Sequence, residues 1–282
     1  MPMVDPLVPW LETIGVVALG LSGVWLGHFF ARRQRPYWLI GYIIPFILLV
    51  SIGLSRRYPA LEFIPPFSWL MSGRTEFAAT AIITTMLLVT PLGRVQNKRL
   101  AILVYSFLVC IITYYAIFPF LLPAIIRKDL LRMQTRLDNH NVCLQSTSYN
   151  CGPAAAVTVL RNIGMPAEEG KIAVMSHTSP ISGTPPDSLY LGLNKMYAGS
   201  GLHFEYRRFD TVAELVGREP MIAIVRFSFM VDHYVAVLKV NQNKLTVGDP
   251  IGGIRHMTYN QFRKIWRNSA IILSPKPLKT KI

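Results

Sequence analysis

Acidic residues are scarce in this sequence, and charged residues of either sign are few. Its 282 residues include 15 Asp and Glu against 29 Lys and Arg, and charged residues amount to only 16%. Hydrophobic residues amount to 51%, and the mean hydropathy is +0.36. This composition excludes a disordered chain and is too apolar for an ordinary soluble domain, so it predicts a membrane-embedded portion.

The formal net charge of +14 is compatible with nucleic acid, with anionic lipid, or with arginines that flank membrane helices. The distribution of the basic residues decides among these. They are spread along the chain without a dense basic tract, so nucleic acid is not an expected partner, whereas the lipid bilayer is.

Cysteine is also rare, and Cys110, Cys143 and Cys151 allow at most one disulfide, which excludes a disulfide-stabilised scaffold. The histidines show no metal-ligand spacing with cysteines or carboxylates, and the sequence contains no Gly-x-x-x-x-Gly-Lys-Ser/Thr phosphate loop. We therefore expect no cofactor, neither metal nor nucleotide. This chain alone is not expected to be an ATP-driven exporter.

The N-terminal part, residues 1–130, is predicted to be a transmembrane helical anchor. Four apolar runs are each long enough, at about 1.5 Å per residue, to cross the roughly 30 Å of hydrocarbon in a bilayer. They cover residues 8–30, 37–54, 75–92 and 100–126. Asp5 and Glu12 come before most of the first run and arginines follow it, which indicates a transmembrane helix rather than a cleaved signal. Residues 59–71 are too short and proline-broken to span, so they predict an interfacial or re-entrant loop.

The basic residues of the short loops bear on the orientation in the membrane. Six residues between the first and second and between the third and fourth runs favour cytoplasmic loops and external termini: Arg32, Arg33, Arg35, Arg94, Lys98 and Arg99. Seven others favour the opposite: Arg56, Arg57, Arg74, Arg127, Lys128, Arg132 and Arg136. Because the first helix usually dominates topology, we expect an integral protein of a bacterial cytoplasmic membrane with its C-terminal domain extracytoplasmic.

From about residue 137 the pattern changes to short apolar runs separated by turn residues. It predicts a water-soluble α+β domain over residues 137–276, followed by a basic tail over residues 277–282. Helices are expected at residues 154–162, ending at Gly164, and at residues 259–266. Strands are expected at residues 221–225, 234–240, 244–247 and 270–273, with residues 241–243 as the tight turn of a hairpin.

The most informative segment is residues 145–156, in which Cys151 stands at the start of the predicted helix. The unpaired N–H groups and positive dipole end of a helix stabilise a thiolate, the nucleophilic form of cysteine. Pro153 suits a first helical turn, and Gly152 allows close approach of substrate or backbone. Gln145 could donate its side-chain amide beside the Cys151 N–H, and two such donors form an oxyanion hole. Cys110 and Cys143 lack such surroundings and are predicted to serve packing.

The predicted hairpin supplies a possible base for this cysteine. A turn centred near Gln242 would place Asp249 opposite Val235 and diagonal to His233 on the same face, so that carboxylate and imidazole could meet. A change of one residue in the turn register would move Asp249 to the opposite face. Asp232 directly precedes His233, but successive side chains of a strand point in opposite directions, which favours Asp249 as the partner.

These segments resemble the bacteriocin-processing cysteine peptidases, which are papain-like domains that remove double-glycine leader peptides, often as the first domain of peptide exporters. The resemblance covers about residues 142–275 and is carried by residues 145–156, 233–237 and 248–253 and by Phe262 and Trp266. It implies that Cys151 is the nucleophile, His233 the general base and acid, Asp249 the group that orients the imidazole, and Gln145 the oxyanion donor. Asn150 stands where that family often has an acidic residue, which bears on substrate preference.

The sequence therefore predicts an α-helical transmembrane region of about four helices followed by a papain-like α+β domain. The leading hypothesis is a membrane-anchored cysteine peptidase that cleaves a peptide or protein substrate, with a separate exporter as a possible partner. The first alternative is a peptidase-like domain that binds peptides without cutting them, as an accessory subunit of an export or sensing system. The second is a transferase that passes the acyl group from Cys151 to an amine.

Overall fold

The computed structural model describes residues 7–228 and 231–275. The chain divides into two compact units, separated in sequence between Ile125 and Ile126, and each unit is described by itself. The predicted basic tail, residues 277–282, and the last residue of the predicted α+β domain lie outside the described residues.

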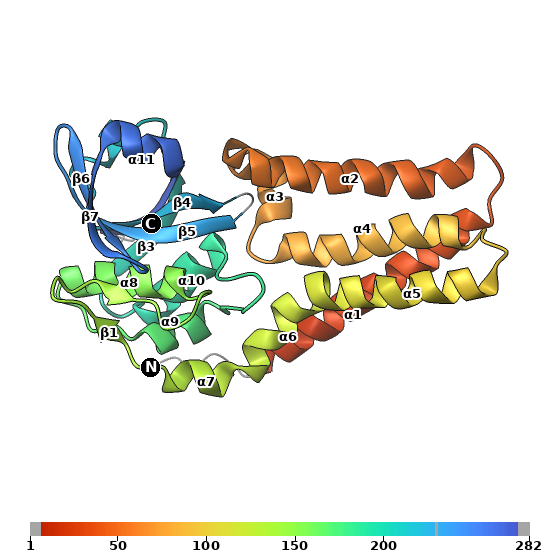
Figure 1. The fold of residues 1–282 in the computed structure, drawn as a ribbon, viewed down its shortest axis with the longest axis horizontal. Helices are drawn as coiled ribbons and strands as arrows, with labels where there is room; N and C mark the ends of the chain where they lie inside the picture. Colours follow the sequence, from red (N-terminus) through yellow and green to blue (C-terminus); the bar gives the residue numbers. More distant parts are fainter. Residues whose placement is uncertain (1–6, 229–230, 276–282) are drawn as a thin grey trace, which may run out of the picture. The chain divides into compact units, whose positions relative to one another are not determined.

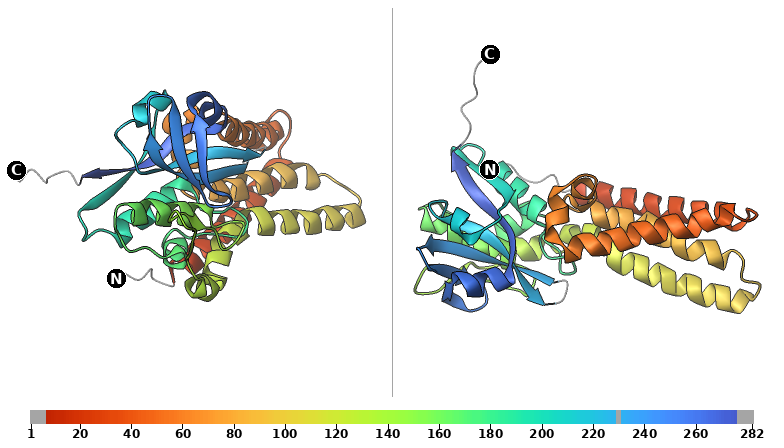
Figure 2. Two further views of the ribbon diagram at one scale, coloured as in Figure 1. Left: turned by 60° about the vertical axis from the view of Figure 1, so that its left-hand side comes forward. Right: turned by 90° about the horizontal axis from the view of Figure 1, so that it is seen from above.

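In the described part of the N-terminal unit, residues 7–125, four helices are long and apolar enough to cross a membrane, as the sequence predicts. The spans run over Val8–Ala31, Tyr37–Arg57, Thr75–Leu92 and Lys98–Ile125. Within them lie α1 (Val8–Ala31), η1 (Tyr37–Leu39), α2 (Ile40–Arg57), α4 (Thr75–Leu92), α5 (Lys98–Ile112), the π-helical turn η3 (Thr113–Ile117) and α6 (Phe118–Ile125). Figure 2 shows α1, α2, α4 and α5 side by side. The predicted loop at residues 59–71 contains two short helical segments, η2 (Pro59–Phe63) and α3 (Phe67–Met71).

Helices α1 and α4 pack closely because glycines of α1 face α4. A methyl group added at Gly23 would overlap Thr85 Oγ1, and one added at Gly27 would lie 2.8 Å from Val89 Cβ. Small residues of this kind let two transmembrane backbones approach, which provides van der Waals contact that the hydrophobic effect does not provide in lipid.

Two ion pairs link the start of α4 to its neighbours, one to the end of α2 and the other to α1. Arg56 donates two hydrogen bonds to Glu76, from Nε to Oε2 at 2.9 Å and from Nη2 to Oε1 at 2.7 Å. Arg74 pairs with Glu12 of α1 and lies over the ring of Phe120. Arg56 and Arg74 therefore each have an acidic partner, which offsets the cost of their partial desolvation.

The C-terminal unit is built on a six-stranded antiparallel sheet in the order β3-β8-β4-β5-β6-β7. The strands are β3 (Leu202–Arg208), β4 (Met221–Ser228), β5 (Val231–Val240), β6 (Lys244–Asp249), β7 (Gly253–Thr258) and β8 (Trp266–Pro275). A two-stranded sheet of β1 (Arg136–Leu137) and β2 (Cys143–Leu144) precedes it. The helices are α7 (Arg127–Arg132), α8 (Cys151–Asn162), α9 (Glu169–Met175), α10 (Pro186–Met196), η4 (Val212–Leu215) and α11 (Tyr259–Ile265).

Strand alternation divides the apolar core between the two faces of the large sheet. Ile222, Ile224 and Ala236 bury their side chains against α8 and α10, whereas their neighbours Ala223 and Val235 bury theirs on the side of α11. Figure 1 shows α8, α9 and α10 together on one side of the sheet and α11 on the other. The sheet is thus covered on both faces, and α8 packs against β5.

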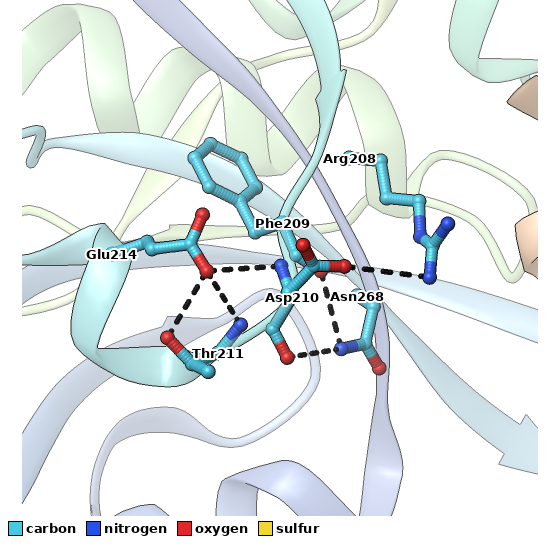
Figure 3. Close-up of polar contacts among 6 residues, drawn as sticks. All are labelled: Arg208, Phe209, Asp210, Thr211, Glu214 and Asn268. Atoms are coloured by element: carbon cyan, nitrogen blue, oxygen red, sulfur yellow. Dashed lines mark hydrogen bonds and ion pairs between the residues drawn. The ribbon is translucent and has the colours of Figure 1, made fainter.

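Side-chain hydrogen bonds fix the connection from β3 to η4 (Figure 3). Thr211 and Glu214 form a capping box in which the Thr211 N–H donates to Glu214 Oε1 at 2.8 Å. Asn268 of β8 donates from Nδ2 to the carbonyls of Phe209 and Asp210 at 3.2 and 3.3 Å. The end of β3 is therefore tied to the neighbouring strand.

The structure confirms several predicted elements and extends others. The helix predicted at residues 154–162 begins earlier, at Cys151, and ends before Gly164, whose φ of +76° is the left-handed conformation that favours glycine. The predicted hairpin is β5–β6, and the predicted strand at residues 270–273 is part of the longer β8, which lies between β4 and β3. The sequence analysis did not identify α9, α10, β3 or β7.

Candidate active site

Cys151 is the first residue of α8, and its side chain is half-buried. Pro153 lies in the first turn, as predicted, and the Ala154 N–H donates to the Asn150 carbonyl at 3.0 Å. The first N–H groups of a helix have no partner within the helix, so those at Cys151 and Gly152 point out of its end. A thiol and backbone N–H donors therefore lie together at one helix terminus.

The glycine after the cysteine is needed for close packing. A methyl group at Gly152 would lie 3.3 Å from Leu189 Cδ2 and 3.4 Å from both Thr184 Cβ and Tyr234 Cδ2. The Tyr234 hydroxyl donates to the Thr184 carbonyl at 2.7 Å, which fastens these neighbours to one another. The start of α8 thus lies against β5, the strand that carries His233.

The imidazole of His233 and the carboxylate of Asp249 meet, as predicted. His233 Nε2 lies 2.9 Å from Asp249 Oδ1, and both side chains are only 8% exposed. Because Asp249 occupies Nε2, the other ring nitrogen, Nδ1, is the one available to a reacting group.

The register that joins these two residues depends on a bulge that the sequence does not reveal. Next to the turn, Val240 pairs with Leu245 and Lys239 with Thr246, which is one residue away from the register of a turn centred at Gln242. Continued without interruption, this pairing would put Asp249 opposite Ala236, on the other face. The irregularity between Val237 and Lys239 restores the pairs Val237–Val247 and Ala236–Gly248. Asp249 therefore follows the pair that aligns it with Val235, diagonal to His233.

Asp249 accepts hydrogen bonds from three groups of the described residues. Besides His233, the Ile251 N–H donates to Oδ1 at 3.0 Å, and Arg255 Nη1 donates to Oδ2 at 2.9 Å. Burial raises the pKa of Asp249. The hydrogen bonds from His233, Ile251 and Arg255 lower it by more than burial raises it, so the pKa falls from 3.8 to about 2. The carboxylate is therefore ionised at every physiological pH.

The same contacts favour the protonated form of His233. Burial lowers the pKa of this imidazole. Hydrogen bonding and charge interactions with Asp249 and Cys151 raise it by more than burial lowers it, so the pKa rises from 6.5 to about 9. Cys151 therefore lies close enough to this ring to affect its pKa. The structure brings together the three groups that the sequence selects as nucleophile, base and orienting acid.

Gln145 is joined through its backbone to the loop that follows Asp249. Its backbone N–H donates to the carbonyl of Pro250 at 2.9 Å. Its side-chain Oε1 is buried and has no hydrogen-bond partner among the described residues. The next residue, Ser146, donates from its N–H to Glu169 Oε1 at 2.8 Å and from its hydroxyl to Oε2 at 2.6 Å. The segment that leads to Cys151 is thus held from both sides.

Cys143 and Asp232 have surroundings of their own, and Cys110 belongs to the other unit. Cys143 is fully buried, and burial together with the charge of Glu169 raises the pKa of its thiol to about 12. Cys110 belongs to α5 of the N-terminal unit, and Cys110, Cys143 and Cys151 are all free. Asp232 pairs with Arg267 at 2.6 Å. Among the described residues, no group of three His, Cys, Asp or Glu side chains could hold a metal ion.

Two residues at the site were not identified from the sequence. Arg255 lies on β7, an unpredicted strand, and Glu169 is the first residue of α9, an unpredicted helix. Glu169 is fully buried, which is unusual for a glutamate and is explained by its bonds to Ser146. An arginine six residues beyond Asp249 is a weak signal unless the tight turn that brings the two together is known.

An antiparallel sheet with helices on both faces, and a cysteine at the start of α8, defines a papain-like α+β cysteine peptidase fold. Residues 139–278 match the model of the Peptidase C39 family, so the C-terminal half of the chain is a Peptidase C39 domain.

Relatives share this half of the chain. An uncharacterized protein of Methanothermobacter marburgensis is 28% identical over 145 residues, which is 51% of this chain and 96% of that protein. The pediocin PA-1 transport/processing ATP-binding protein PedD of Pediococcus acidilactici is 30% identical over 144 residues, which is 48% of this chain and 19% of that protein. The peptidase domain of Streptococcus ComA, a bi-functional ABC transporter, aligns over 47% of this chain and 96% of that domain, with 23% identity and a TM-score of 0.42.

Proposed function

We propose that this protein is a membrane-anchored cysteine peptidase that cleaves peptide bonds with Cys151, His233, Asp249 and Gln145. The observation that carries the proposal is the arrangement around His233: Asp249 Oδ1 lies 2.9 Å from its Nε2, and Cys151, at the start of α8, contributes to its raised pKa. A structural cysteine needs neither a charged imidazole nor a helix terminus, whereas a nucleophilic cysteine uses both.

The proposed reaction proceeds by acyl transfer through Cys151. His233 takes the proton of the thiol, and the sulfur attacks the peptide carbonyl carbon. The oxygen of the tetrahedral intermediate is bound by the Cys151 N–H and the Gln145 side-chain amide. His233 then donates its proton to the leaving amine, which departs as the carbon–nitrogen bond breaks. Water, deprotonated by His233, attacks the thioester and releases the acid and the thiol.

The substrate class follows from relatives whose names describe peptide processing. PedD is described as a transport and processing protein for pediocin PA-1, and LagD of Lactococcus lactis as one for lactococcin G. We extend this to the present chain as a preference for precursors of secreted peptides, including those with leader segments. An exporter that acts on the same precursor, supplied as a separate protein, would be the natural partner.

The four apolar helices associate the protein with a membrane, and anchoring a peptidase there raises its effective concentration near membrane-bound or translocating peptides. The predicted extracytoplasmic placement of the peptidase domain stays a prediction. A reporter fused after Ile282 that is active on only one side of the membrane tests it, and activity on the cytoplasmic side would overturn it.

Labelling of the full-length protein in nanodiscs with a peptide epoxide tests the proposed function. Mass spectrometry should find the adduct on Cys151 and not on the buried Cys143. The variant His233→Ala should label at least about a hundredfold more slowly, because general acid–base catalysis contributes 10²–10⁴-fold. His256→Ala, at an exposed histidine of β7, is the matched control and should label like the wild type.

The same experiment separates the alternatives. Absence of an adduct on Cys151 in folded protein would overturn the peptidase proposal and favour a peptide-binding module. A transferase would label at Cys151 as well, but its product would differ. With a peptide substrate and an added amine, hydrolysis gives the free acid, whereas transfer gives the amide, and the two products differ in mass.

A further inference from the structure

Arg255 contacts the carboxylate oxygen that His233 leaves free. Its Nη1 donates to Asp249 Oδ2 at 2.9 Å, while Oδ1 is occupied by His233 and by the Ile251 N–H. The Asp249 side chain is 8% exposed and that of Arg255 is 56% exposed. The arginine therefore brings its charge to a buried carboxylate while most of its own length remains in water, which limits its desolvation cost.

The turn between β6 and β7 creates this contact. Asp249 pairs with Gly253, and Val247 pairs with Arg255, so Arg255 is the diagonal neighbour of Asp249 on the same face of the two strands. Gly253, directly opposite Asp249, has a φ of +73°. A methyl group added there would lie 2.9 Å from Asp138 Oδ2, so both the backbone conformation and the space favour glycine at this position.

We infer that Arg255 is a positioning residue of the proposed peptidase site, which fixes the Asp249 carboxylate so that Oδ1 faces His233. This inference rests on the proposed function. A carboxylate bound through only one oxygen can rotate about its Cβ–Cγ bond, and each rotation changes the line along which the imidazole is held. The Ile251 N–H and Arg255, one on each oxygen, define the plane of the group.

Loss of Arg255 has a predictable direction of effect. The freed Oδ2 would be a buried acceptor without its cation, and the carboxylate would become easier to protonate, since hydrogen bonding from Arg255 is one of the causes that lower the pKa of Asp249. A neutral Asp249 no longer stabilises the imidazolium of His233. This loss of stabilisation should move the acidic limb of Cys151 reactivity to higher pH.

The test measures the rate of Cys151 alkylation by iodoacetamide between pH 4 and 9 in the full-length protein in nanodiscs, resolved from Cys110 and Cys143 by mass spectrometry. We expect Arg255→Gln to shift the acidic limb upward by about 0.5–1 pH unit, at the low end of the effect of one neighbouring opposite charge. Arg255→Lys should recover at least half of the shift. Arg263→Gln, at an exposed arginine of α11, is the control and should leave the limb in place.

Protection of Cys143 reports whether each variant is folded, because this thiol is fully buried. If Arg255→Gln exposes Cys143, then Arg255→Met, which keeps the aliphatic stem but no donor, decides in its place. If a folded variant with an uncharged residue at position 255 shows the same acidic limb of Cys151 alkylation as the wild type, the positioning role of Arg255 is overturned. Failure of the proposed function gives a different result, namely a wild-type Cys151 profile that does not respond to His233→Ala.

Discussion

The raised pKa of His233 predicts that the C-terminal unit loses stability in mildly alkaline solution. A group whose pKa is higher in the folded than in the unfolded state stabilises the fold in full below the unfolded value. That contribution disappears as the pH rises through the folded value. For His233 these values are 6.5 and about 9, so the stabilisation is complete below pH 6.5 and is lost as the pH rises to 9 and beyond.

The size of this effect follows from the shift. At about 1.4 kcal/mol per pKa unit, the rise from 6.5 to about 9 corresponds to about 3 kcal/mol. The side chain is 8% exposed, so water screens the interaction little. Replacement of Cys151 by Ala should reduce the effect without reversing it, because Cys151 contributes to the raised pKa and Asp249 remains in place.

Cys143 provides an assay that reports on this unit within the full-length protein. Its thiol is fully buried, so iodoacetamide reaches it only when the unit opens. Short pulses of iodoacetamide in increasing urea, read by mass spectrometry, give the free energy of unfolding at each pH. The rate in fully unfolded protein at the same pH corrects for ionisation of the thiol.

The comparison that decides is between the wild type and His233→Ala. The free energy of unfolding of the wild type should fall by about 3 kcal/mol more than that of the variant between pH 6.5 and 9.5. His256→Ala is the control and should follow the wild type. Parallel profiles for the wild type and His233→Ala would show that the imidazole is not stabilised as an imidazolium, and the argument for an activated Cys151 would lose its basis.

Three further predictions concern parts that hold the fold and the site. Glu169→Gln should lower the free energy of unfolding of the C-terminal unit by about 1.5–3 kcal/mol, since it replaces charged hydrogen bonds with neutral ones; unchanged protection of Cys143 in urea would contradict this. Deletion of Leu238 removes the bulge but keeps the pairs Val237–Val247 and Lys239–Thr246 on either side of it, so epoxide labelling of Cys151 should persist while Cys143 stays protected; loss of labelling in folded protein would refute the register argument. Gly23→Ala should cost about 1–3 kcal/mol by overpacking α1 against α4, seen as a lower thermal midpoint in detergent, whereas Gly15→Ala, with nothing within 4 Å, should not.

The sequence predicted the membrane helices, the cysteine at a helix start and the hairpin because each has a strong local signal. Long apolar runs, the Gly-Pro-Ala run after Cys151 and alternating apolar residues need no distant context. The missed strands β3 and β7 are the two edges of the sheet. In β3 only Phe204 is fully buried, so the strand shows little apolar alternation. The missed helix α9 has seven residues, too few for a clear helical period.

The meeting of His233 and Asp249 was predicted correctly from a turn that is not quite the observed one. The residues next to the turn pair in a register that alone would separate the two groups, and the bulge at Leu238 brings them back together. Local propensity does not encode such a bulge, because the residue is an ordinary apolar one. The bulge is favoured instead by where it places the Asp249 carboxylate. With the bulge, Asp249 meets His233 and Arg255; without it, a carboxylate would face the apolar core beside Ala236, at a cost of several kcal/mol. The same ion pairs that would make the site reactive therefore also determine the register of the sheet, so that Asp249→Ala should disturb the β5–β6 pairing more than His233→Ala does.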